Sequence, residues 1–267
     1  MTGVQTCALP IYKVMTARSG GAGSVVAYNF MDDQFINGQE HWQEIGLNGS
    51  HGTGSHDVLF EGNQASNLDS DHTHGNAIYH TFFRNWATGV RTPFTDPISG
   101  VRIDDAHDKP GGNAPLRAAG VMGYTYWMAF VGNVLGASSV TTAARGWALD
   151  VAREPGRTGR VWLLGWNEHP PYNSDPDSTT RTFRHGNYDY YGNNVRWDAG
   201  TTNHTLPSSL YLSSAPAFFS AGSGYPWPWV TPTSSSPLQS GPSGCDGSCS
   251  GLPAKARYDA GSPFVQP

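Results

Sequence analysis

Four residues that could carry out acid–base or metal chemistry lie close together in the sequence, at Asp69, Asp71, His72 and His74. Paired carboxylates can act as general acid and general base on a glycosidic bond. Asp69 and Asp71 could instead bind Ca²⁺, which prefers carboxylate oxygens as ligands. The spacing matches no metal-binding signature such as His-Glu-x-x-His. The alternative is that these side chains cap turns and hydrogen-bond the loop backbone.

Residues before and after this cluster could complete such a site. The predicted catalytic residues are Asp69, Asp71, His74 and Arg84. The predicted substrate-binding residues are His72, Arg102, Asp104 and Asp105. Either Arg84 or Arg102 could act as the base or bind a substrate carboxylate, and His51, His56 and Glu61 could lie near the cluster. An acidic groove repels an anionic ligand unless Ca²⁺ or an arginine intervenes.

Leu68 is the one apolar residue in the stretch from Asn67 to Asn76. This composition predicts a polar loop that projects from the folded chain, with the Pro-, Gly- and Asp-rich segment 92–120 as the second wall of a groove. On that interpretation the short acidic side chains project from a rigid edge. Asp71→Ala would then remove activity and leave thermal stability nearly unchanged.

A repeated pattern indicates the elements that would position this loop. Asparagine occurs at 29, 63, 85, 133 and 167, and three residues before each stands Val26, Phe60, Phe82, Phe130 or Leu164. The basic period is that from Asn63 to Asn85, and longer intervals indicate inserted loops. The pattern predicts a stacked coil of parallel strands, with aromatic rings stacked inside it and asparagines bonded to one another. The alternative is that asparagine simply ends strands, as in any β protein.

Composition favours a loop-rich β protein with one sizeable domain. The chain has 267 residues, including 33 Gly and 19 Pro. Only 14% of residues are charged, compared with about 25% in typical globular proteins. With a net charge of −5 and few lysines, we expect no nucleic-acid partner. No apolar run reaches the roughly 18 residues of a membrane span, so none is expected.

We expect five segments along the chain. Residues 1–11 resemble a translated sequencing adapter and are interpreted as an artefactual leader, so the chain is interpreted as truncated at its amino-terminal end. Residues 12–205 form the coil and 206–230 an aromatic, Pro-rich cap over its exposed end. Residues 231–252 have the composition of a Ser/Pro/Gly linker, and 253–267 form a tail that packs on the coil.

Two pairs of residues near the carboxyl end have their own interpretation. Trp227 and Trp229 could stack on a sugar ring, although covering the end of the coil is the favoured role.

Cys245 and Cys249 are close enough in sequence to close a small disulfide loop. Such a bond indicates an oxidising compartment.

Several segments resemble bacterial right-handed parallel β-helix proteins of the pectate-lyase-like superfamily. They are HDVLFEGN, DSDHTHGNAIYHTFFRNW, FVGNVLG and RHGNYDYYGNNVRWD. The resemblance implies an all-β, right-handed parallel β-helix (a solenoid) that is extracellular or on the cell surface. It also implies action on acidic polysaccharide by β-elimination, with Ca²⁺ as the possible cofactor. We expect a monomer.

Two other functions stay open. A non-catalytic β-helix could bind glycans or act as an adhesin. A polygalacturonase-like hydrolase is the third alternative, because Asp32-Asp33 and His74-Gly75 are similar to motifs of those enzymes. The Asn-Thr-Asp and Arg-Ile-Lys motifs of that family are absent from the sequence.

Overall fold

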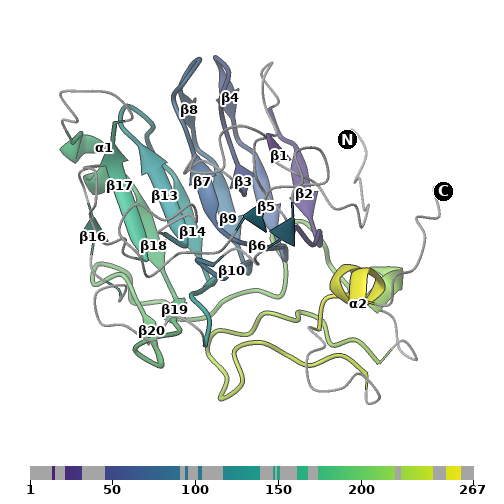
Figure 1. Ribbon diagram of the computed structural model, residues 1–267. Helices are drawn as coiled ribbons and strands as arrows, with labels where there is room; N and C mark the ends of the chain where they lie inside the picture. Colours follow the sequence, from purple (N-terminus) through teal and green to yellow (C-terminus); the bar gives the residue numbers. More distant parts are fainter. Residues whose placement is uncertain are drawn as a thin grey trace.

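The computed structural model describes residues 22–31, 46–90, 117–138, 147, 161–167, 174–219, 224–242 and 251–259. It also describes the backbone of 14–15, 94–95, 102–103 and 149–150. This part of the chain is mostly β (Figure 1), and its helical segments are short: α1 (Pro176–Thr180), η2 (Ala217–Phe219) and α2 (Pro253–Asp259). None of the helices in the described residues is long and apolar enough to cross a membrane.

Four sheets make up the body of the molecule. Sheet I contains β1 (Val14–Met15), β3 (Leu47–Asn48), β7 (Leu68–Ser70), β13 (Ala119–Met122), β17 (Trp162–Trp166) and β16 (Leu149–Asp150). Sheet II contains β4 (Ser55–His56) and β8 (Ala77–Ile78). Sheet III contains β2 (Val25–Ala27), β5 (Leu59–Glu61), β9 (Thr81–Phe83), β14 (Ala129–Val131) and β18 (Phe183–His185). Sheet IV contains β6 (Gln64–Ala65), β10 (Trp86–Ala87), β15 (Val134–Leu135), β19 (Asn187–Asp189) and β20 (Asn194–Arg196).

The chain returns to these sheets in a fixed order. From β3 it passes through β4, β5 and β6, then through β7, β8, β9 and β10 in the same sequence of sheets I to IV. Each strand of the second circuit pairs in parallel with its counterpart in the first. A later circuit repeats the order, with Tyr126 bridging to Ile78 in place of a sheet II strand. This topology is compatible with a β-solenoid.

Three phenylalanines form a stack inside the molecule, as the repeat predicts. Phe60, Phe82 and Phe130 occupy matching register positions in β5, β9 and β14 and are fully buried. Both neighbouring ring pairs have centroids 4.7 Å apart and nearly parallel planes. Parallel pairing brings identical positions one above another, so the same ring shape recurs along the core.

A ladder of buried asparagines runs beside the phenylalanine stack. From the second member onwards, the side-chain oxygen accepts hydrogen bonds from the backbone N–H and the side-chain amide of the asparagine one circuit earlier, at 2.9–3.0 Å. The members of this asparagine ladder are Asn29, Asn63, Asn85, Asn133 and Asn187. These bonds pair buried amide groups of neighbouring circuits, which would otherwise lack partners in the interior.

The fifth member corrects the sequence prediction, which placed Asn167 and Leu164 in these columns. Leu164 belongs to β17 of sheet I, and it is Arg184 that lies beside Phe130 in sheet III. The ladder requires a left-handed residue just before each asparagine: Tyr28, Gly62, Arg84, Gly132 and Gly186 all have φ between 51° and 68°. Trp166, which precedes Asn167, is not among the residues with positive φ.

The polar stretch 67–76 also differs from the prediction. Instead of projecting as a loop, its first part forms β7 of sheet I, and Asp69 and Asp71 are buried. Hydrogen bonds and an ion pair satisfy these polar groups inside the molecule, as described below. A pattern of apolar residues therefore fails to identify this strand.

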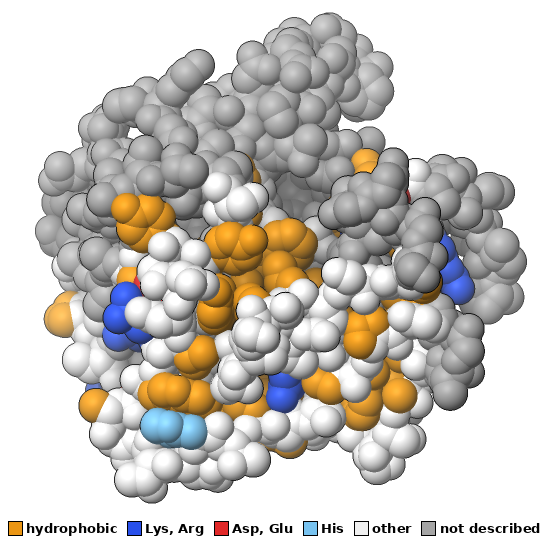
Figure 2. All heavy atoms as spheres, turned by 90° about the horizontal axis from the view of Figure 1, so that it is seen from below, with side chains coloured by type: hydrophobic (Ala, Val, Ile, Leu, Met, Phe, Trp, Pro, Cys, Tyr) orange, Lys and Arg blue, Asp and Glu red, His pale blue; other side chains and the backbone are white. Residues whose placement is uncertain are grey.

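The described parts of the segment 206–230, residues 206–219 and 224–230, pack on sheets III and IV. Trp229 is buried beside Ala27 and Val134, and its indole N–H donates to the Gly62 carbonyl at 2.7 Å. Trp227 donates to the Tyr28 hydroxyl at 2.9 Å. Trp229 therefore serves packing rather than sugar stacking. Figure 2 shows the side on which this segment runs, with hydrophobic side chains gathered between polar ones.

The remaining carboxyl-terminal residues fold back in part. Val230 bridges to Leu238, Leu252 is fully buried, and the ring of Tyr258 in α2 lies 4.9 Å from that of Phe30. The stretch predicted as a linker thus contributes to packing at both of its described ends. Cys245 and Cys249 lie outside the described residues, so their predicted disulfide stays a prediction.

Candidate functional site

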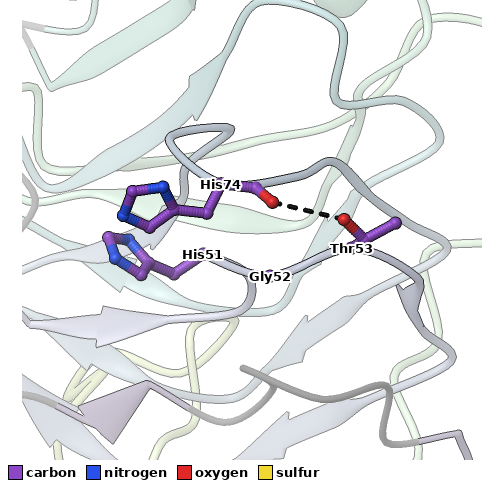
Figure 3. Close-up of a pocket in the computed structure, with 4 residues that line it drawn as sticks. All are labelled: His51, Gly52, Thr53 and His74. Carbon is purple, nitrogen blue, oxygen red and sulfur yellow. Dashed lines mark hydrogen bonds between the residues drawn. The ribbon is translucent and has the colours of Figure 1, made fainter.

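An open pocket of about 410 Å³ lies where the loops after β3 and β7 meet. Its lining residues are His51, Gly52, Thr53 and His74. Figure 3 shows the His51 and His74 side chains side by side and pointing in the same direction, each from its own loop. Their centroids are 4.7 Å apart and their planes nearly perpendicular. Two imidazoles at this spacing can act on one ligand.

A hydrogen bond and a close approach of the backbones hold the two loops together. The Thr53 hydroxyl donates to the His74 carbonyl at 3.2 Å (Figure 3). Gly75 lies so close to Thr53 that a Cβ on it would stand 2.4 Å from the Thr53 nitrogen, which only glycine avoids. His51 has a φ of 97°, a conformation that costs free energy in a residue with a side chain. Such strain is typical of residues held for function.

Asp71 orients His51. The His51 Nδ1 atom lies 3.1 Å and 3.2 Å from the two carboxylate oxygens of Asp71. The same carboxylate accepts from the Asn48 amide and, at 3.0 Å, from the Thr73 N–H. Because Asp71 is fully buried, its charge is compensated by these donors. A carboxylate that fixes one nitrogen of a histidine can direct the other to accept a proton.

Asp69 has a different partner. Its carboxylate forms a buried ion pair with Arg117, whose Nε atom donates at 2.9 Å. Gly120 leaves room for this pair, because a Cβ there would meet both side chains within 2.5 Å. Asp69 does not line the pocket and is committed to structure in sheet I.

The described residues contain no group of three His, Cys, Asp or Glu side chains that could hold a metal ion. Ca²⁺ takes about 6–8 oxygen ligands, whereas the oxygens of Asp69 and Asp71 already accept hydrogen bonds from protein donors. These two residues do not fit a calcium site in this arrangement. Calcium binding by the chain stays a prediction.

Arg84 lies elsewhere, at the bend between sheets III and IV. Its guanidinium donates to the carbonyls of Leu206, Pro207 and Val230 at 3.1, 2.8 and 2.6 Å. Burial lowers the pKa of Arg84, while the nearby Glu61 carboxylate raises it. The structure therefore uses Arg84 to hold the segment 206–230 and does not bring it to His74.

Of the other predicted residues, His72 is described in full and does not line the pocket. His72 Nδ1 is 2.6 Å from the Gly123 carbonyl, and its ring lies 6.0 Å from that of Tyr124. Arg102 is in β12 (Arg102–Ile103), which pairs with β11 (Phe94–Thr95), and only its backbone is described. Asp104 and Asp105 lie outside the described residues.

A second buried polar group forms around Glu61. It accepts from the Tyr28 hydroxyl at 3.0 Å and from the Leu210 N–H at 2.9 Å. Burial raises the pKa of Glu61. The group joins sheet III to the carboxyl-terminal segment and does not open on the pocket.

His51 is the residue whose role the sequence left least defined. The signal for it is the recurrence of His-Gly at 51–52 and 74–75, close to the period that separates Asn63 from Asn85. Stacking by that period places the two histidines on neighbouring circuits. No family model, curated protein or solved structure matches this chain.

Proposed function

We propose that the chain is a right-handed parallel β-helix, similar to pectate lyases, that acts on acidic polysaccharide by β-elimination. The recurring order of parallel sheets supports the fold, because a solenoid needs that order. The observation that carries the reaction is the contact between Asp71 and His51 at a pocket shared with His74. The extracellular or cell-surface location belongs to the same proposal.

The chemistry assigns a role to each residue. His51, oriented by Asp71, removes the proton from the carbon next to the uronate carboxylate. The electron pair forms a carbon–carbon double bond as the bond to the leaving glycosidic oxygen breaks. His74 delivers a proton to that oxygen, which yields an unsaturated uronate. Asp71 is a positioning residue, and Arg102 remains the predicted partner of the substrate carboxylate.

The test uses polygalacturonate and alginate, with ultraviolet absorbance reporting the unsaturated product. We expect His51→Ala and His74→Ala each to reduce the rate by about 100-fold or more. His204→Ala, an exposed histidine outside the pocket, is the matched control and should keep the wild-type rate. Asp71→Asn should lower the rate and shift its pH profile, which a purely structural role would not do.

The remaining outcomes separate the alternatives. Full activity in His51→Ala would refute the assignment. Reducing sugar without ultraviolet absorbance would indicate a hydrolase, and polysaccharide binding without either product a glycan-binding or adhesive protein. A chelator that abolishes the wild-type rate, with recovery on adding Ca²⁺, would establish the predicted cofactor.

Glycan binding without catalysis has support of its own. Large aromatic side chains are exposed at Tyr79, Tyr124 and Trp127, and the rings of Tyr79 and Trp127 stack on each other. Exposed aromatics in a cluster are typical of binding surfaces.

A further inference from the structure

Tyr79 and Trp127 form an exposed aromatic stack outside the pocket. They are 48% and 42% exposed, and their rings lie 5.2 Å apart with planes inclined by 19°. Parallel bridging of Ile78 to Tyr126 places the two residues one above the other on neighbouring circuits. The stack therefore has a defined geometry although the core does not enclose it.

The backbone beneath the stack is strained. Gly23, Asp57, Tyr79 and Trp127 occupy one column of the repeat, with φ of 66°, 52°, 59° and 56°. Glycine is the residue best suited to this conformation, and the first circuit has it. An exposed aromatic at such a position contributes little to the core, which leaves its outer face available to a ligand.

The two ends of the stack differ. Beyond Trp127 the guanidinium of Arg181, from the next circuit, lies 5.2 Å from the Trp127 ring. Beyond Tyr79 the column continues with Asp57, whose short side chain cannot extend the stack. Its carboxylate is 60% exposed and lies 2.9 Å from His56 Nδ1. The outer face of Tyr79 thus borders an exposed hydrogen-bond acceptor.

We propose that Tyr79 and Trp127 form a binding platform for a pyranose ring of a glycan. The apolar face of the sugar packs on the Tyr79 ring, and hydroxyl groups donate hydrogen bonds to the Asp57 carboxylate. Burying the carbon-bound hydrogens against the ring supplies affinity, and the carboxylate supplies orientation. Because Asp57 is negative, the platform takes an uncharged sugar unit rather than a uronate.

The loop before β8 carries His74 of the pocket, and Tyr79 of the platform directly follows β8. His74 and Tyr79 are five residues apart, and so at most about 18 Å apart along an extended chain. Asn76 donates to the Tyr124 carbonyl at this loop, which fixes it to the neighbouring circuit. The platform would hold a neutral unit of a mixed polysaccharide whose uronate units enter the pocket. This placement rests on the proposed function, whereas sugar binding at Tyr79 does not.

The test measures binding to neutral xylan and cellulose oligosaccharides by calorimetry, with oligogalacturonate in parallel. We expect Tyr79→Gly to weaken binding of a neutral oligosaccharide by about tenfold or more. Its melting temperature should stay equal or rise, because glycine relieves the strained φ. Tyr191→Ala, an exposed tyrosine outside the stack, is the control and should bind as the wild type does.

Three results would overturn the platform. They are wild-type binding to none of these neutral sugars, unchanged binding by Tyr79→Gly, or an equal loss in Tyr191→Ala. A lower melting temperature in Tyr79→Gly with unchanged binding would assign the stack to stability. Failure of the proposed reaction gives a different pattern, in which Tyr79→Gly still loses neutral-sugar binding but no variant or wild type forms unsaturated product. Asp57→Asn adds a second check, since it should improve binding of oligogalacturonate relative to neutral sugar.

Discussion

The phenylalanine stack and the histidine pocket are built from the same circuits of chain but use them in opposite ways. In the stack, each circuit supplies the same residue type to the same place, so that Phe60, Phe82 and Phe130 repeat one contact. In the pocket, neighbouring circuits supply different partners, such as Asp71 for His51. Repetition gives a stable interior, and departures from it give a site.

The largest expected effect on stability comes from removing the middle ring of the stack. Phe82→Ala should lower the free energy of unfolding by about 3–5 kcal/mol, because a fully buried ring is lost and a cavity remains. Chemical denaturation measures this change. Phe183→Ala, at a 40% exposed ring in β18, is the control and should cost much less. Equal losses in the two variants would show that the stack is not the centre of the core.

The second prediction concerns His80, a buried histidine beside the phenylalanine stack. Its ring packs against Phe60 with centroids 6.2 Å apart, accepts from the Val58 N–H at 3.2 Å and lies 3.0 Å from the Ser55 hydroxyl. Burial lowers the pKa of His80 to about 4. The unfolded chain binds a proton on this imidazole more tightly than the folded chain does. The contribution of neutral His80 to the free energy of unfolding is therefore fully present above pH 6.5 and is lost as the pH falls from 6.5 towards 4.

The loss should reach about 3 kcal/mol, since one pKa unit corresponds to about 1.4 kcal/mol. Denaturation curves between pH 4 and pH 7 measure it. In His80→Gln the stability should vary less steeply with pH in this window, even if the variant is less stable overall. A slope identical to that of the wild type would show that another group controls acid unfolding.

The interior could be predicted from the sequence to a large extent, and the asparagine ladder shows both the success and its limit. Apolar residues three positions before an asparagine identified the three stacked rings and four of the five ladder residues. The pattern failed at Asn187, because Arg184 replaces the aromatic residue there. The Gly-Asn pairs at 62–63, 132–133 and 186–187 identify the left-handed bend more directly.

The site was harder to predict because its contacts join residues far apart in the sequence. Asp69 resembles a ligand until its ion pair with Arg117, 48 residues later, is known. Asp71 is buried rather than projecting, so Asp71→Ala should cost stability, contrary to the sequence-based expectation. Arg84 donates to three carbonyls in a segment more than a hundred residues away. The sequence around Arg84 contains no pattern that predicts these acceptors.

The smallest effect on stability is expected at His51, and comparing it with a change at Gly62 distinguishes a functional role of His51 from a structural one. His51→Gly removes the contact with Asp71 but relieves a φ of 97°. These effects oppose each other, so the free energy of unfolding should change by no more than about 1 kcal/mol, while activity is lost. Gly62→Ala is the matched change in the ladder. Its new Cβ would meet the Tyr28 ring at 2.4 Å at a φ of 68°, so it should destabilise clearly. If His51→Gly proves the more destabilising of the two, His51 is held for structure, and the pocket is only another part of the repeat.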